Sequence, residues 1–248
     1  MSKTTDIISS ELNYMVDEEK RSVLLRFFKT GKGEYGEGDK FLGVTVPNIR
    51  SVASQHLDIP VRDVEILLAS PWHEIRMCGL LIMVECCKNT RKKSWIRVHS
   101  EEKGEELRKQ CFELYLKNTA RINNWDLVDL SAPVIIGEYI ADKPRDVLYH
   151  LAESTSLWEQ RIAVVSTLVL IRKNDFNDIY MLAEMLLHHP HDLMQKAIGW
   201  MLREAGKMDE PRLLDFLDNH SIEMPRTMLR YAIEKFTDVK REYYMKRT

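Results

Sequence analysis

The chain has 248 residues, of which 44% are apolar and 30% are charged, and this composition excludes a globally disordered protein. Its formal net charge of −2 excludes a uniformly basic nucleic-acid-binding protein, so a basic surface can arise only from local segregation of charge. With 10 Gly and 8 Pro, the chain has too few turn residues for an all-β sandwich, and helices are favoured from the outset.

The predicted elements begin with two helices before residue 30. Ser9 or Ser10 can cap a first helix that ends near Asp17, and Glu18 to Lys29 is predicted to form a second helix. The segment Gly31 to Gly38 (GKGEYGEG) is the one glycine-rich loop. It lacks the Lys-Ser/Thr ending of a phosphate-binding loop and no strand precedes it, so we interpret it as a flexible connection.

From Val46 onward, the apolar spacing predicts helices in quick succession, and no window alternates with period two. We expect helices at residues 47–57, 60–69, 72–87, 104–118, 124–140, 144–153, 157–172, 177–188, 192–206, 209–219, 225–236 and 238–246. Proline stands at or before the start of many of them, where the missing N–H costs nothing: Pro47, Pro60, Pro71, Pro144, Pro211 and Pro225. The sequence therefore predicts an all-α protein.

A longer periodicity is present as well. Three segments begin with a charged residue and continue as an apolar run. They start at Asp126, Arg161 and Lys196, at steps of 35 residues. The segments that start at Arg76 and Arg226 fit the same template. Helix-pair repeats of this length are typical of an α-solenoid of HEAT-like repeats, with a concave face. We expect one domain that spans residues 1–248, and a monomer.

Metal, cofactor and membrane sites are not predicted. The four Cys have no paired metal spacing, and a reduced, cytoplasmic compartment is expected. His188, His189 and His191 are interpreted as a loop cluster without a ligand role, and HEIR at His73 lacks the second His of a zinc-protease motif. The N-terminus has no apolar signal core, and no segment approaches the roughly 20 apolar residues of a membrane span.

One helix face carries the leading candidate site. Trp125 and Asp129 are four residues apart and are therefore neighbours on a helix. Asp129 stands in the middle of an apolar run (LVDLSAPVII), where an unpaired carboxylate is costly. We therefore expect Asp129 to be paired, to cap another group or to be functional.

Basic residues recur on the inner helices that follow, with the indole of Trp200 among them: Arg161, Lys196, Arg203, Lys207, Arg226 and Arg230. This basic line predicts a locally positive concave surface despite the global charge. For the part from Lys196 to Lys207 taken alone, a solvated face and a phosphate-binding face are equally open.

At these residues the sequence resembles the AlkD-type DNA glycosylases, which are alkylation-repair proteins built of HEAT-like repeats. The similarity spans nearly the whole chain in family order, through FLGVTVPNIR, NNWDLVD, WEQRIAVVS, QKAIGWMLRE and MPRTMLRYAIEKF. The resemblance implies base-excision repair without a cofactor: hydrolytic release of N3-alkyladenine and N7-alkylguanine, both cationic, from duplex DNA.

The resemblance also implies roles for single residues. Asp129 matches the catalytic carboxylate of the family, and Trp125 and Trp200 match its two active-site tryptophans. Arg161 matches the arginine that holds the DNA backbone beside the lesion. The stretch GKGEYGEGD before Phe41 departs from the family pattern, so no N-terminal catalytic residue is assigned.

A lone carboxylate suits this chemistry because an alkylated cationic purine is already a good leaving group. Asp129 has only to stabilise an oxocarbenium-like sugar and place a water, and two indole faces favour the cation by about 0.5–2 kcal/mol each. The resemblance implies that the lesion stays stacked rather than flipped. Two alternatives stay open: a HEAT protein that binds damaged or branched DNA without catalysis, and a protein-binding scaffold.

Overall fold

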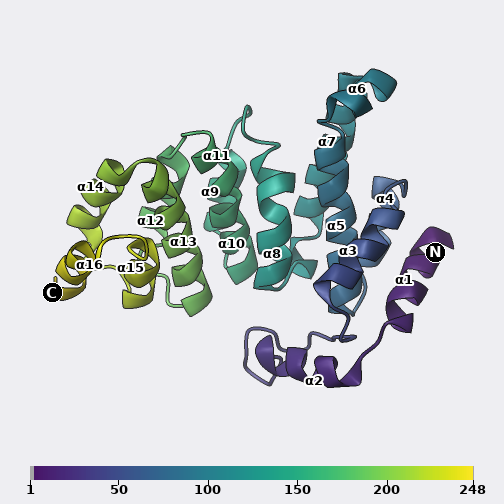
Figure 1. The fold of residues 1–248 in the computed structure, drawn as a ribbon, viewed down its shortest axis with the longest axis horizontal. Coiled ribbons are helices and arrows are strands. Elements are labelled where there is room, and N and C mark those ends of the chain that lie inside the picture. Colours follow the sequence, from purple (N-terminus) through teal and green to yellow (C-terminus); the bar gives the residue numbers. More distant parts are fainter. Residues whose placement is uncertain (1–2, 248) are drawn as a thin grey trace. The chain divides into compact units, whose positions relative to one another are not determined.

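The computed structural model describes residues 3–247, and the chain in that range is an all-helical α-solenoid, as the periodicity predicts (Figure 1). The chain divides into two compact units, residues 1–135 and residues 136–248. Among the described residues, no helix combines the length and the apolar character that a membrane crossing requires.

The first unit is built around a central buried helix, α5 (His73–Asn89), which packs against α1, α3, α4, α7 and α8. Thirteen of its residues are buried, because Leu, Met, Cys and Val side chains occupy almost its whole circumference. The other helices of this unit are α1 (Lys3–Tyr14), α2 (Glu18–Phe27), α3 (Val46–Gln55), α4 (Val61–Leu68), α6 (Lys93–His99), α7 (Glu101–Lys117), the 3₁₀ turn Thr119–Arg121 and α8 (Trp125–Ala132).

The second unit is organised around α13 (Asp192–Met208), whose apolar face packs against α10, α11, α12, α14 and α15. Its remaining helices are α9 (Asp146–Ala152), α10 (Leu157–Ser166), α11 (Leu168–Arg172), α12 (Asn177–Met185), α14 (Glu210–His220), α15 (Arg226–Ala232) and α16 (Asp238–Lys246). A π-helix, Pro133–Gly137, lies at the division between the units.

The start of the chain differs from the sequence prediction. Neither Ser9 nor Ser10 caps a helix, because α1 is already helical at Lys3, and the Ser9 hydroxyl donates back to the Thr5 carbonyl at 2.9 Å. Asp17 is instead the N-cap of α2, and its carboxylate accepts the Lys20 N–H at 3.0 Å.

Two predicted long helices are interrupted, and a short one was not predicted. The expected helix 124–140 changes to π geometry at Pro133, which lacks the N–H that an α-helix needs there. The expected helix 157–172 breaks at Thr167, whose hydroxyl donates to the Val164 carbonyl at 2.6 Å and competes with the helical ladder. Helix α6, Lys93–His99, was missed because it buries no residue.

The glycine-rich segment forms a series of turns rather than a plain flexible connection. The carboxylates of Glu34 and Glu37 accept the backbone N–H groups of Gly31 and Gly33. The Gly36 N–H donates to the Lys29 carbonyl at 3.1 Å. These bonds bring the chain back onto the unit directly before Asp39, which is buried.

Gly43 is required where the chain passes α2. Its φ of 86° is in the left-handed region, and a methyl group on its Cα would overlap the Asp17 carbonyl oxygen. Gly43→Ala is therefore expected to destabilise the fold by more than the roughly 1–2 kcal/mol that left-handed backbone alone costs an L-residue. Urea denaturation measures this loss.

Gly33→Ala is the matched control, because Gly33 has a φ of 79° with open space around the position of a side chain. Its free energy of unfolding is expected to fall only by the roughly 1–2 kcal/mol that left-handed backbone costs an L-residue. Equal losses of unfolding free energy in the two variants would show that the structure relieves the overlap with Asp17 at no cost in stability.

Candidate functional site

A predominantly apolar cavity of the first unit has a volume of about 650 Å³ and lies between α2, the segment 41–46, α5 and α8. Four aromatic rings and three acidic side chains line it: Phe27, Phe28, Phe41, Trp125, Glu74, Asp126 and Asp129. Lys20 and Arg50 contribute the basic groups of the lining besides His73. A cavity of this size, with few polar groups among aromatic rings, has the general character of a ligand site.

Helix α8 supplies both candidate residues of the first unit. The side chain of Asn124, the N-cap, accepts the Trp125 N–H at 2.9 Å, so the helix begins at Trp125. Trp125 and Asp129 lie one turn apart, are both half-buried and both border the cavity. Burial, together with the charge of Asp129, raises the pKa of the Tyr115 phenol behind this helix.

Trp125 is held by aromatic rings from α2 and its C-terminal end. The Phe28 ring lies 5.5 Å from the indole, and the Phe27 ring approaches it edge-on at 5.9 Å. Phe28 in turn stacks on Phe41 at 5.0 Å. Phe27 is 59% exposed, so this aromatic wall is open to solvent on one side.

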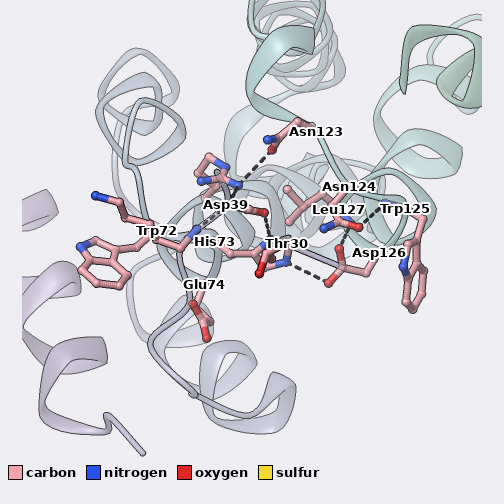
Figure 2. Close-up of polar contacts among 12 residues, drawn as sticks. Thr30, Asp39, Trp72, His73, Glu74, Asn123, Asn124, Trp125, Asp126 and Leu127 are labelled. Atoms are coloured by element: carbon pink, nitrogen blue, oxygen red, sulfur yellow. Dashed lines mark hydrogen bonds and ion pairs between the residues drawn. The ribbon is translucent and has the colours of Figure 1, made fainter. Parts of the chain in front are cut away.

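A largely buried ionic network adjoins the aromatic wall, and two of its members, His73 and Asp126, also line the cavity. Figure 2 shows the His73 ring between two carboxylates: Nδ1 lies 2.9 Å from Asp39 Oδ2, and Nε2 lies 2.9 Å from Asp126 Oδ2. Burial alone lowers the pKa of His73, but the charges and hydrogen bonds of Asp126 and Asp39 outweigh it and raise this pKa to about 9. His73 is therefore an imidazolium at neutral pH and donates to both carboxylates.

Arg76 extends this network to the segment that precedes α8. Its guanidinium donates to Asp39 Oδ1 at 2.6 Å, to Asn123 Oδ1 at 3.0 Å and to the Arg121 carbonyl at 3.0 Å. Burial raises the pKa of Asp39, but the hydrogen bond from His73 and the charge of Arg76 outweigh it, and the net shift is downward. The pair is thus ionised although both side chains are buried.

Glu74 fixes the other wall of the cavity. Its buried carboxylate accepts the backbone N–H groups of Leu42, Gly43 and Val44 at 2.9, 2.8 and 3.3 Å. Three residues of the HEIR segment therefore have structural partners around the cavity. These roles were not predicted from HEIR, which lacks a zinc motif, although three ionisable residues at the start of a buried helix are a usable signal.

The remaining candidate residues belong to the second unit. Trp200 is half-buried on α13. Arg161 on α10 is only 5% exposed, and its guanidinium donates to the Leu193 carbonyl at 2.6 Å. Arg226 and Arg230 are exposed on α15, and Arg226 donates to the Met245 carbonyl.

The basic residues of α13 have acidic neighbours. Lys196 pairs with Asp192 at 2.6 Å, and Lys207 pairs with Glu204 at 2.8 Å. Arg203 pairs with Glu234 and lies 3.4 Å from Glu204. The charge of this stripe is thus partly compensated within the unit, a feature that the sequence analysis did not predict.

The histidine cluster before α13 makes local contacts. His189 Nε2 lies 2.9 Å from Gln160 Oε1, and the His191 side chain accepts the Leu193 N–H at the start of the helix. Burial, and then the charge of His191, lowers the pKa of His189. Across residues 3–247, no group of three or more His, Cys, Asp or Glu side chains is placed to hold a metal ion.

Comparison with known proteins places these features in context. The sequence model of the DNA alkylation repair enzyme family matches residues 8–236. Among solved structures, the chain is similar to a predicted DNA alkylation repair enzyme from Enterococcus faecalis, with a TM-score of 0.66 and 14% identity over 90% of this chain and 98% of that one. No curated protein matches the chain with significant similarity.

Proposed function

The chain belongs to the DNA alkylation repair enzyme family, and on that premise we propose that it is a monofunctional DNA glycosylase. Its proposed substrates are N3-alkyladenine and N7-alkylguanine in duplex DNA. The observation that carries the proposal is the placement of Trp125 and Asp129 one turn apart in the wall of an aromatic cavity. No cofactor or metal enters this proposal.

The proposed chemistry needs a single acid. The alkylated purine carries a positive charge and departs without prior protonation, so the sugar becomes oxocarbenium-like in the transition state. The Asp129 carboxylate stabilises this charge and orients the attacking water through a hydrogen bond. We propose that the indoles of Trp125 and Trp200 present their electron-rich faces to the cationic nucleotide.

DNA binding is proposed for the basic line, namely Arg161, Lys196, Arg203, Lys207, Arg226 and Arg230. An ion pair between partly exposed side chains contributes only about 0–1 kcal/mol to stability. Lys196 and Lys207 can therefore exchange Asp192 and Glu204 for DNA phosphates at little cost. The family model spans both units, which supports one functional domain over residues 1–248. We also propose a monomer acting in the cytoplasm, on a lesion that stays stacked.

The test is release of free base from duplex DNA that carries 7-methylguanine, measured by chromatography. We expect the wild-type protein to release the base without any added metal or cofactor. Binding of the duplex is expected to weaken steeply with salt if the basic line contacts phosphates. If the protein binds the duplex but releases no base, a non-catalytic protein that binds damaged or branched DNA is favoured. If the protein does not bind the duplex and releases no base, a protein-binding scaffold is favoured.

A further inference from the structure

Two carboxylates flank His73, that of buried Asp39 and that of half-buried Asp126. The proposed chemistry does not use either of them, although Asp126 and His73 line the candidate cavity. We propose that His73 is a positioning residue, whose imidazolium clamps Asp39 to Asp126 and thereby holds the first turn of α8, with Trp125 and Asp129, in its working place. This inference rests on the proposed function, because the place that matters is that of Asp129 relative to the sugar.

Asp126 connects the clamp to the site. It follows Trp125 directly and stands three residues before Asp129, within the first turn of α8. Its Oδ2 is held by His73 at 2.9 Å, and its Oδ1 accepts the Leu127 N–H at 2.8 Å. Both carboxylate oxygens are therefore engaged, one by α8 itself and the other by α5, which is the central buried helix of the unit.

His73 has no freedom to choose other partners. Its side chain is 2% exposed, with the Phe41 ring stacked on it at 4.4 Å and the Phe28 ring at 5.3 Å. The charged groups that face it are Asp39 from the loop before Phe41 and Asp126 from α8, while Arg76 of α5 contacts the far oxygen of Asp39. The neighbouring Glu74 is occupied by backbone N–H groups.

The charge state of His73 therefore decides whether the clamp exists. An imidazolium has two N–H donors and satisfies both carboxylates, whereas a neutral imidazole has one and leaves the other carboxylate facing a lone pair. The pKa of about 9 places this change in the alkaline range. Below that pH the clamp is intact, and it is lost as the pH rises through about 9.

The proposed chemistry has no protein group of its own that titrates there. An ionised carboxylate acting on a cationic base requires no general acid, so no protein group of the chemical step titrates between neutral and alkaline pH. The 7-methylguanine cation can itself lose its N1 proton in alkali, but that change is the same for every variant, and His73→Gln is therefore the reference for the wild type. A fall in excision rate with a midpoint near pH 9, relative to that reference, would report the loss of the His73 clamp.

The experiment measures single-turnover release of 7-methylguanine at saturating protein across the neutral and alkaline range, corrected for spontaneous release. We expect the wild-type rate to fall with a midpoint near pH 9, with an unchanged Kd for the duplex. His73→Gln, which can donate to only one of the two carboxylates at a time, is expected to be slower by about tenfold at neutral pH and to lack the fall near pH 9.

His56→Gln is the matched control. His56 also contacts a carboxylate, Glu11 at 2.8 Å, and it does not line the cavity. We expect this variant to keep both the wild-type rate and the alkaline fall. A wild-type profile that is parallel to the His73→Gln profile would overturn the role of His73.

Tryptophan fluorescence separates this inference from the proposed function. If the clamp holds Trp125, the wild-type emission shifts with a midpoint near pH 9, and the shift is absent in both Trp125→Phe and His73→Gln. Should the wild type release no base, the glycosylase proposal fails, and the fluorescence titration alone judges the clamp. A wild-type emission that does not change through this range would overturn it.

Discussion

Replacement of Asp129 by Asn is expected to slow the release of 7-methylguanine by about 10²–10³-fold, while the affinity for the duplex changes little. The amide keeps the shape of the side chain but loses the charge that stabilises an oxocarbenium-like sugar. Single-turnover rates at saturating protein measure the chemical step, and a salt titration of duplex binding measures affinity separately.

Two further Asp→Asn variants sharpen this result. Asp58→Asn changes an exposed acid that does not line the cavity, and it is expected to match the wild type. Asp126→Asn changes the second carboxylate of α8, whose proposed role is to be held by His73, so we expect a rate loss similar to that of His73→Gln. An Asp129→Asn variant as fast as wild type, with Asp126→Asn inactive, would assign the catalytic role to Asp126 instead.

The helical class and the position of the first-unit candidates were predictable because both depend on local patterns. Apolar spacing at a period near 3.6 residues identifies most of the helices, and the four-residue step from Trp125 to Asp129 places them on one face. In the structure both residues do line one cavity. The errors fall where a single side chain overrides the pattern, as at Pro133 and Thr167.

The buried network was not predictable in the same way, because its partners are far apart in the sequence. His73 and Asp39 are separated by 34 residues, and His73 and Asp126 by 53. Periodicity reports which face of a helix is buried, but it does not report which distant charge will meet that face. Asp39 also follows the glycine-rich segment, whose turns determine where the acid is placed.

The same limit applies to the basic line. The sequence shows cations recurring on successive helices, but Arg203 pairs with Glu234, which is 31 residues away in the turn after α15. Lys196 and Lys207 have acids three or four residues away on α13 itself, which the spacing does contain. A count of acids at these helical steps would have predicted partial compensation of the stripe.

The largest stability effect is expected for Arg76→Met, which is predicted to lower the free energy of unfolding by about 3–5 kcal/mol. Methionine fills a similar volume but removes the charge opposite Asp39 and the donors to Asn123 and to the Arg121 carbonyl. The Asn123 side chain and the carbonyls of Arg121 and Ser70 then lose their donor, and the buried carboxylate of Asp39 keeps only His73 and the Lys40 N–H. Urea denaturation followed by circular dichroism measures the loss.

Arg62→Met provides the control with the same substitution. The Arg62 side chain is 87% exposed and lies 3.6 Å from Asp63, so its removal is expected to change the unfolding free energy by less than about 1 kcal/mol. A similar small loss in Arg76→Met would show that Asp39 and the segment before α8 are held by other contacts. In that case His73→Gln should slow excision by the same factor in the Arg76→Met background as in the wild type, because Arg76 would not contribute to the position of Asp39.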